Sequence, residues 1–112
     1  MTEPATVPRL EPRDQTALHE IIARVLMVPL ASVRADADLV YDLGAESIDF
    51  LDLLFSLEPL VGGRVLPEHW APWLAERLPQ MRDNRGITTG IVAEFVIHER
   101  ARTATQSQGE TE

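Results

Sequence analysis

Apolar residues recur at helical spacing in several stretches of the chain, and polar, proline-containing segments separate these stretches. The first stretch covers about residues 14–27, where apolar side chains three, four and seven residues apart form one face of a helix. Asp14 is a suitable N-cap, and Val28-Pro29 ends the helix because the residue before a proline disfavours helical angles. The predicted core face consists of Leu18, Ile21, Ile22, Val25 and Leu26.

A long connection and a second helix follow. We interpret residues 30–41 as a loop that inserts apolar side chains into a helical core, and these are Val33, Leu39 and the nearby Leu43. The second helix is expected to begin at Ser47 and to end before Pro59. Its inward face is predicted to consist of Ile48, Leu51, Leu54 and Phe55, with Phe50, Leu53 and Leu57 alongside.

The rest of the chain is predicted to complete a helical bundle. Gly62-Gly63 breaks the chain, Pro67-Glu68 opens a short turn, and Pro72 suits the first position of a third helix. This helix is expected to include Leu78, and Pro79 limits or kinks it. The last helix is expected over about residues 88–102, capped by Thr88 or Thr89. Its inward face is predicted to consist of Ile91, Val92, Phe95 and Val96. Four helical segments with short links predict an all-α, up-and-down four-helix bundle.

The length and composition fit one small domain with polar ends. The chain has 112 residues, of which 45% are hydrophobic, and this is enough for one core. Residues 1–12 are expected to be a disordered lead, because Pro4, Pro8 and Pro12 block regular structure. Residues 103–112 are polar and are expected to form a disordered tail. The folded domain is therefore predicted to cover residues 13–102.

Charge and residue types restrict the classes of function. The formal net charge is −8, which disfavours nucleic acid and anionic membranes as partners and favours a basic protein surface. The chain has no cysteine, which excludes disulfides and thiolate chemistry. No stretch resembles a signal peptide or approaches the roughly 20 apolar residues that span a bilayer. We therefore expect a cytoplasmic protein without stable membrane insertion.

Ser47 has the most distinctive surroundings of any polar residue in the chain. Gly44 permits a tight turn with positive φ shortly before it. A helix that begins near Ser47 presents free N–H groups and partial positive charge, which favour an attached phosphate ester. The hydroxyl would lie on an exposed corner, accessible to a modifying enzyme. The alternative is that Ser47 is only a helix cap, although a capping box needs Glu or Gln where Phe50 stands.

Residues 42–49 read Asp-Leu-Gly-Ala-Glu-Ser-Ile-Asp and resemble the Asp-Ser-Leu motif region of acyl carrier proteins. In that family the serine receives 4′-phosphopantetheine from coenzyme A, and the thiol of this arm carries acyl groups as thioesters. The order of helix, long loop, motif, acidic helix and closing helix also resembles the family over about residues 14–102. The sequence departs from the family pattern at Glu46, where aspartate is usual, and at Ile48, where leucine is usual.

The resemblance implies that Ser47 is the covalent attachment site of 4′-phosphopantetheine. The residues that would frame this site are Asp42, Leu43 and Gly44. The apolar residues that would shelter the acyl chain inside the bundle are Phe50, Leu54 and Val92. The chain would then be a monomeric carrier that serves as a substrate for enzymes, and it would not itself be an enzyme.

Partner docking is the second property that the resemblance implies. Residues 36–58 contain seven acidic side chains and no arginine, and such a field speeds the encounter with a basic partner. The implied partners are a phosphopantetheinyl transferase, and ketosynthases and acyltransferases with basic docking patches. The acidic residues that would contact them are Glu46, Asp49 and Asp52.

Residues 47–52 and 66–70 are similar to a subgroup of carriers that hold very-long-chain acyl groups for lipid A biosynthesis. Proteins of that subgroup have an enlarged segment between the second and last helices, and residues 70–85 occupy that place here. Trp70 and Trp73 lie three residues apart in this segment. They either pack the segment onto the bundle or line a cavity for a long acyl chain, and both interpretations stay open.

Two other kinds of protein fit part of the pattern. A peptidyl or aminoacyl carrier uses the same arm, but its motif usually lacks the acidic residue that Glu46 supplies before the serine. An unmodified acidic helical interaction module would use the same bundle for binding only. Whether Ser47 accepts the arm distinguishes this module from a carrier.

Catalysis and metal binding have weaker support. A serine hydrolase needs a base, and no recognisable motif contains any of the three histidines, which are His19, His69 and His98. The spacing Gly-x-Ser-x-Gly also fails, because Asp49 occupies its final position. A calcium loop on Asp36, Asp38 and Asp42 fails, since Val40 replaces a ligand and the loop glycine is missing. No metal site is predicted.

Overall fold

The computed structural model of the chain describes residues 9–77 and 86–110, and this part of the chain is helical. Its elements are α1 (Pro12–Leu26), the 3-10 turn η1 (Leu30–Ser32), α2 (Ser47–Ser56), α3 (Glu58–Val61), α4 (Pro67–Arg77) and α5 (Thr89–Glu110). The prediction of an all-α bundle is confirmed, and the one-turn helix α3 is an addition to the four predicted helices. None of the described helices is long and apolar enough to cross a membrane.

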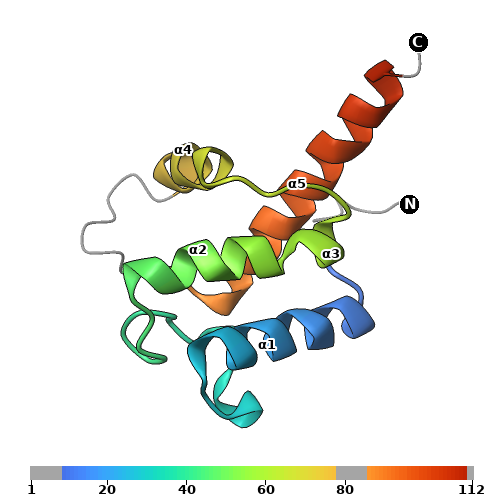
Figure 1. The fold of residues 1–112 in the computed structure, drawn as a ribbon. Helices are drawn as coiled ribbons and strands as arrows, with labels where there is room; N and C mark the ends of the chain where they lie inside the picture. Colours follow the sequence, from blue (N-terminus) through green and yellow to red (C-terminus); the bar gives the residue numbers. More distant parts are fainter. Residues whose placement is uncertain (1–8, 78–85, 111–112) are drawn as a thin grey trace, which may run out of the picture.

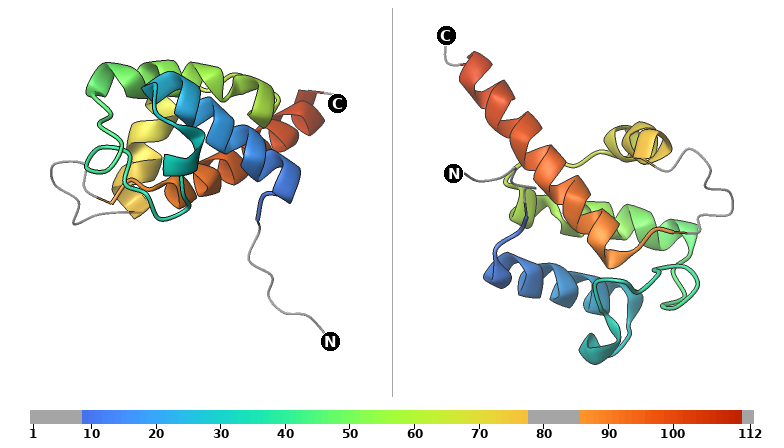
Figure 2. Two further views of the ribbon diagram at one scale, coloured as in Figure 1. Left: turned by 90° about the horizontal axis from the view of Figure 1, so that it is seen from below. Right: turned by 180° about the vertical axis from the view of Figure 1, so that it is seen from behind.

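Helices α1 and α2 lie side by side, and α5 packs across them (Figure 1). The right-hand view of Figure 2 shows α5 running diagonally over α2 toward α1. Helix α4 lies on the side of α2 that faces away from α1 in both views. The start of α2 is therefore at one end of the bundle, and α4 is a separate element above α2 and α5.

Helix α1 begins two residues earlier than predicted, and Asp14 is not its cap. Pro12 occupies the first turn and Glu11 the N-cap position, which fits the fixed φ of proline at a helix start. Asp14 instead accepts a hydrogen bond from Arg100 Nη2 at 3.1 Å. The predicted end is confirmed: Met27 is left-handed with φ 58°, and the Val28 N–H bonds the Ala23 carbonyl at 3.0 Å.

The described elements extend past the predicted limits of the folded domain, residues 13–102, at both ends. Leu10 is buried in the core, so the ordered chain begins before residue 13, while residues 1–8 lie outside the described residues. Helix α5 continues to Glu110, where a disordered tail from 103 was expected, and its last turns extend beyond the other helices (Figure 1). Gly63 also approaches α5 closely, because a Cβ on it would lie 3.0 Å from Thr103 Cγ2.

The connection between η1 and α2 is an ordered loop, as predicted. Val33, Leu39 and Leu43 are buried in the core. The carboxylate of Asp38 organises the loop, since its Oδ1 accepts the N–H groups of Val40 and Tyr41 at 2.9 Å each. Its Oδ2 accepts the Gly86 N–H at 2.9 Å, which joins the loop to the segment before α5.

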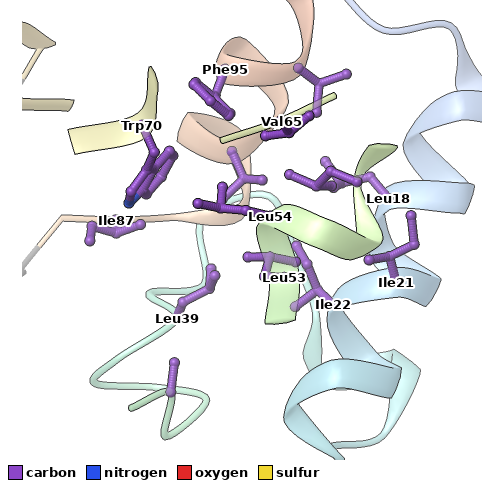
Figure 3. Close-up of a cluster of buried hydrophobic side chains, with 14 of the residues drawn as sticks. Leu18, Ile21, Ile22, Leu39, Leu53, Leu54, Val65, Trp70, Ile87 and Phe95 are labelled. Carbon is purple, nitrogen blue, oxygen red and sulfur yellow. The ribbon is translucent and has the colours of Figure 1, made fainter. Parts of the chain in front are cut away.

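The predicted inward face of α2 is wrong at three of its four positions. Ile48, Leu51 and Phe55 are 69%, 55% and 70% exposed, whereas Leu54 is buried as predicted. The buried face instead consists of Leu53, Leu54 and Leu57. In Figure 3, Leu53 points toward Ile22 of α1, and Leu54 points toward the side on which Phe95 of α5 lies. This helix has two apolar stripes, and its periodicity alone does not show which one α1 and α5 cover.

The last two helices differ from the prediction at their starts. Helix α4 begins at Pro67, and Pro72 lies inside it instead of opening it. The His69 N–H bonds the Leu66 carbonyl at 2.9 Å, which forms the first turn before Pro72 is reached. Leu78 and Pro79, which were predicted to extend and limit this helix, lie outside the described residues. Thr88 caps α5, as predicted, because its Oγ1 accepts the Ile91 N–H at 3.2 Å.

Candidate functional site

Ser47 is the first residue of α2, and its side chain is exposed. The N-cap position belongs to Glu46, whose backbone is extended with φ −112° and ψ 169°. The Glu46 N–H donates to Asp49 Oδ2 at 2.8 Å in a capping-box arrangement. Ser47 is therefore not the N-cap of α2, because Glu46 occupies that position and forms the capping box with Asp49. The Ser47 hydroxyl remains available on the first turn.

A short backbone turn presents Ser47. Gly44 has φ 78°, a conformation that L side chains rarely adopt, while an added Cβ would meet nothing within 4 Å. The glycine is therefore needed for its conformation and not for space. Buried side chains of Leu43 and Ala45 hold the turn on each side of Gly44. The Ala45 N–H also donates to the Leu39 carbonyl at 2.8 Å, so the turn is attached to the core.

The three acidic residues proposed for docking have different surroundings. Glu46 and Asp52 are exposed, whereas Asp49 is half-buried and bonded to the backbone of Glu46. Upstream, the Asp42 carboxylate accepts the Asp38 N–H at 2.9 Å and stabilises the loop. Asp38 and Asp42 thus have structural roles within the loop. Of the three acidic residues proposed for docking, Glu46 and Asp52 are exposed to solvent.

The sequence interpretation missed an exposed apolar stripe on α2. We call Ile48, Leu51 and Phe55 the outer stripe, because they are the exposed apolar residues of this helix. They stand at positions i, i+3 and i+7, so they line one face of the helix and begin next to Ser47. Exposed apolar residues with acidic neighbours are typical of a protein interface. The sequence did contain a signal for this stripe, because α2 has more apolar residues than one buried face of a helix requires.

The residues predicted to shelter an acyl chain belong to the hydrophobic core or pack against it. Leu54 and Val92 are buried, with 2% and 0% exposure. Phe50 is half-buried, and its ring stacks on Trp70 with 6.2 Å between centroids and 21° between planes. Figure 3 shows Trp70 entering the same cluster from α4. The structure therefore places Phe50, one of the three predicted shelter residues, against a tryptophan of the segment between α3 and α5.

The histidines that a hydrolase would need are not arranged around the serine. His69 Nδ1 lies 3.0 Å from Glu99 Oε1, and His98 Nε2 lies 3.9 Å from Glu99 Oε2. Among the described residues, no hydrogen bond or ion pair joins a histidine to Ser47. A serine without an adjacent base lacks the activation that nucleophilic catalysis requires.

A helical bundle with an exposed serine at a helix start, behind a glycine turn and beside exposed acidic and apolar residues, has the layout expected of a carrier domain. Residues 16–65 match the profile of a family described as the phosphopantetheine attachment site. An acyl carrier protein of Saccharopolyspora erythraea is 38% identical over 48 residues. That match spans 43% of this chain and 50% of the relative, so the chain matches about half the length of that protein.

The two similarities support the acyl carrier and phosphopantetheine attachment family and a carrier role. Proteins of this family are carriers and not enzymes, and the similarity implies a covalently attached 4′-phosphopantetheine. The fold fits this family, since the matched residues form α1, the ordered loop, α2 and α3. Helices α4 and α5 lie beyond the matched residues.

Proposed function

We propose that this protein carries acyl groups as thioesters on a 4′-phosphopantetheine arm attached to Ser47. The observation that carries the proposal is the exposed Ser47 hydroxyl on the first residue of α2, with the cap supplied by Glu46 and Asp49. The free N–H groups of the first turn favour an attached phosphodiester, which offsets repulsion from the nearby carboxylates. When bound, the arm supplies the thiol on which the acyl group is held.

The attachment step follows from the chemistry of the serine. In the site of a phosphopantetheinyl transferase, Ser47 Oγ attacks the phosphorus of coenzyme A that bears the pantetheine group. A new O–P bond forms, the pyrophosphate bond breaks, and 3′,5′-ADP leaves while a base of the transferase takes the serine proton. Asp42, Leu43 and Gly44 contribute by holding the serine on an ordered turn. The chain itself needs no catalytic group for this step.

The docking surface for partner enzymes combines charge with an apolar stripe. Glu46 and Asp52 face solvent near the outer stripe of Ile48, Leu51 and Phe55. A partner with basic residues around an apolar patch complements this face, and its long-range attraction speeds docking. Asp49 adds its charge while it caps the helix. The partners that fit are a phosphopantetheinyl transferase, ketosynthases and acyltransferases.

The proposed pathway is the synthesis of lipids with long acyl chains, such as the very-long-chain groups of lipid A. Support comes from the segment between α3 and α5, which forms an additional helix with two tryptophans against the core. Glu46 favours an acyl carrier over a peptidyl or aminoacyl carrier, for the reason given above. The length of the acyl chain that the protein carries would distinguish a pathway of very-long-chain lipids from one of shorter acyl chains.

The test is the intact mass of the protein after incubation with coenzyme A, magnesium and a broad-specificity phosphopantetheinyl transferase. We expect a gain of one phosphopantetheine group, and no gain in a Ser47→Ala variant. The variant should keep the circular dichroism of the native protein, because Ser47 caps nothing. No gain in the native protein, with a transferase that modifies a known carrier in the same tube, would favour the unmodified interaction module.

A further inference from the structure

A pocket lies at the end of α2 that is opposite to Ser47. Its volume is about 570 Å³, and the residues that line it come from α1, the end of α2, α3 and the loop after α3. Figure 1 shows α3 following that end of α2. We call it the distal pocket, and its lining includes Arg24, Phe55, Glu58, Gly62, Gly63 and Arg64.

The apolar part of the distal pocket continues the outer stripe. Phe55 is the last residue of that stripe, and its ring is exposed to solvent. Gly62 and Gly63 line the pocket with backbone only, and Gly62 ends α3 in a left-handed conformation with φ 88°. A partner that covers the outer stripe therefore reaches the distal pocket without leaving the apolar surface.

Two exposed arginines line the distal pocket. Arg24 lies in the last turn of α1, where a positive charge complements the helix dipole, and Arg64 lies in the loop after α3. Within residues 9–77 and 86–110, neither guanidinium forms an ion pair, whereas four other arginines each pair with a carboxylate. The two guanidiniums of the distal pocket are therefore available to an acid from outside the chain.

The acid of the distal pocket, Glu58, has a role inside the protein. Its side chain is half-buried, and its Oε2 accepts the Val65 N–H at 3.0 Å, which fixes the loop that contains Arg64. Two guanidiniums beside one carboxylate leave a positive charge in excess at this pocket, although the chain as a whole has a formal net charge of −8. A carboxylate is the group whose charge and geometry complement such a pair of guanidiniums.

Opposite charges therefore mark the two ends of the outer stripe. Phe55 lies eight residues after Ser47, a rise of about 12 Å along the helix. The stripe has exposed Glu46 beside its start, and Arg24 and Arg64 beside its end. A partner that lies along it meets negative charge near Ser47 and positive charge at the distal pocket. Reversing the partner would bring like charges together, so the arrangement favours one orientation.

We propose that the distal pocket receives an acidic side chain, with an apolar neighbour, from the enzymes that dock on the outer stripe, the phosphopantetheinyl transferase among them. This inference rests on the proposed carrier function and adds an acidic anchor to the basic surface of the partner. The carboxylate of the anchor pairs with Arg24 and Arg64, and its apolar neighbour packs on Phe55. The anchor fixes the direction in which the partner lies along α2.

The kinetics of arm attachment test the anchor with a change of known sign. A variant with both Arg24→Gln and Arg64→Gln loses two positive charges, which changes the formal net charge from −8 to −10. Long-range attraction to a basic enzyme alone would then lower KM. Loss of the anchor acts in the opposite direction, and we expect KM of the transferase for the protein to rise about threefold while kcat stays native.

The matched control removes two exposed arginines outside the distal pocket. A variant with both Arg9→Gln and Arg13→Gln has the same net charge, and its KM should stay native or fall. An unchanged or lower KM in the pocket variant, which still accepts the arm, would overturn the distal pocket as a docking site. If the native protein does not accept the arm, the proposed function itself fails.

Peptide binding tests the distal pocket without an enzyme. The isotope-labelled protein is titrated with the amidated peptide acetyl-Leu-Glu-Leu or with its Gln counterpart, and the amide NMR signals of Gly62 and Gly63 are followed. We expect Kd to be about threefold lower for the Glu peptide, and equal for the two peptides in the pocket variant. Equal Kd values in the native protein would overturn the proposal.

Two further measurements examine other occupants of the distal pocket. Inorganic phosphate is titrated in the same way, and saturation at a lower concentration than with the Glu peptide would assign the pocket to phosphate groups. Sedimentation of the protein alone tests a second copy of the chain. A dimer that forms in the native protein and not in the pocket variant would overturn a partner enzyme as the occupant.

Discussion

The attachment region, residues 16–65, and helix α4 are joined to the molecule by different kinds of contact. In the attachment region, backbone hydrogen bonds and aliphatic side chains hold the chain. The Leu39 N–H bonds the Ile87 carbonyl at 2.9 Å, and Leu18, Ile22 and Leu53 pack between α1 and α2 (Figure 3). Helix α4 is held by the rings of Trp70 and Trp73, by buried Leu74, and by the contact of His69 with Glu99 of α5. The comparison shows that aliphatic packing and backbone bonds hold one region, whereas aromatic rings and charged groups hold much of the other.

The two kinds of contact differ in how well water can replace them when they break. Close-packed aliphatic side chains have no equivalent contacts in water, so a shift of α1 against α2 exposes apolar surface at about 25 cal/mol per Å². Ring pairs contribute about 0.5–1.5 kcal/mol in addition to the burial of the rings, and a buried carboxylate such as that of Glu99 is unfavourable without polar partners.

The largest expected effect concerns the core residue that both regions share. Phe95 is fully buried and contacts both tryptophans of α4, so Phe95→Ala should lower the free energy of unfolding by about 3–5 kcal/mol. Urea unfolding followed by circular dichroism measures the loss. Phe55→Ala removes the same atoms from an exposed site and should change stability by less than about 0.5 kcal/mol. Similar losses in the two variants would contradict the assignment of inner and outer faces.

A smaller effect is expected at the cap of α2. Asp49→Ala removes the acceptor for the Glu46 N–H and should lower the free energy of unfolding by about 1 kcal/mol. Asp52→Ala removes one negative charge from an exposed part of the same helix and should leave stability nearly unchanged. The rate of arm attachment, measured by mass at low ionic strength, should fall in both variants. A cap effect of equal size at Asp52 would show that charge, and not the capping bond, stabilises the helix.

The smallest effect on stability is expected at the outer stripe. Leu51→Ser should leave the urea midpoint unchanged, because Leu51 is 55% exposed. It should lower kcat/KM for the transferase by about fivefold, which corresponds to about 1 kcal/mol of docking energy. Ala17→Ser, on the half-buried side of α1, is the control that should keep native kinetics. Native kinetics for Leu51→Ser would exclude this residue from the docking surface.

The position of Ser47 at the start of a helix was predictable because the residues that determine it are close together in the sequence. Gly44, Glu46, Ser47 and Asp49 lie within six residues, and a turn, a cap and a helix start depend on such short-range contacts. The end of α1 before Pro29 and the Thr88 cap of α5 were predictable for the same reason. The capping box of Glu46 and Asp49 was not predicted, since the sequence analysis considered Ser47 itself as the alternative cap.

What the sequence by itself determined is the all-helical chain, the ordered loop and the place of Ser47 at a helix start, because these depend on neighbouring residues and on apolar spacing. Only the tertiary structure decided which stripe of α2 faces the core, because α1 and α5 cover one side of a helix that is apolar on two. The contact between His69 and Glu99 also needed the fold, since these residues are 30 positions apart and meet only when α4 lies on α5. Contacts between distant segments depend on packing that no local pattern encodes.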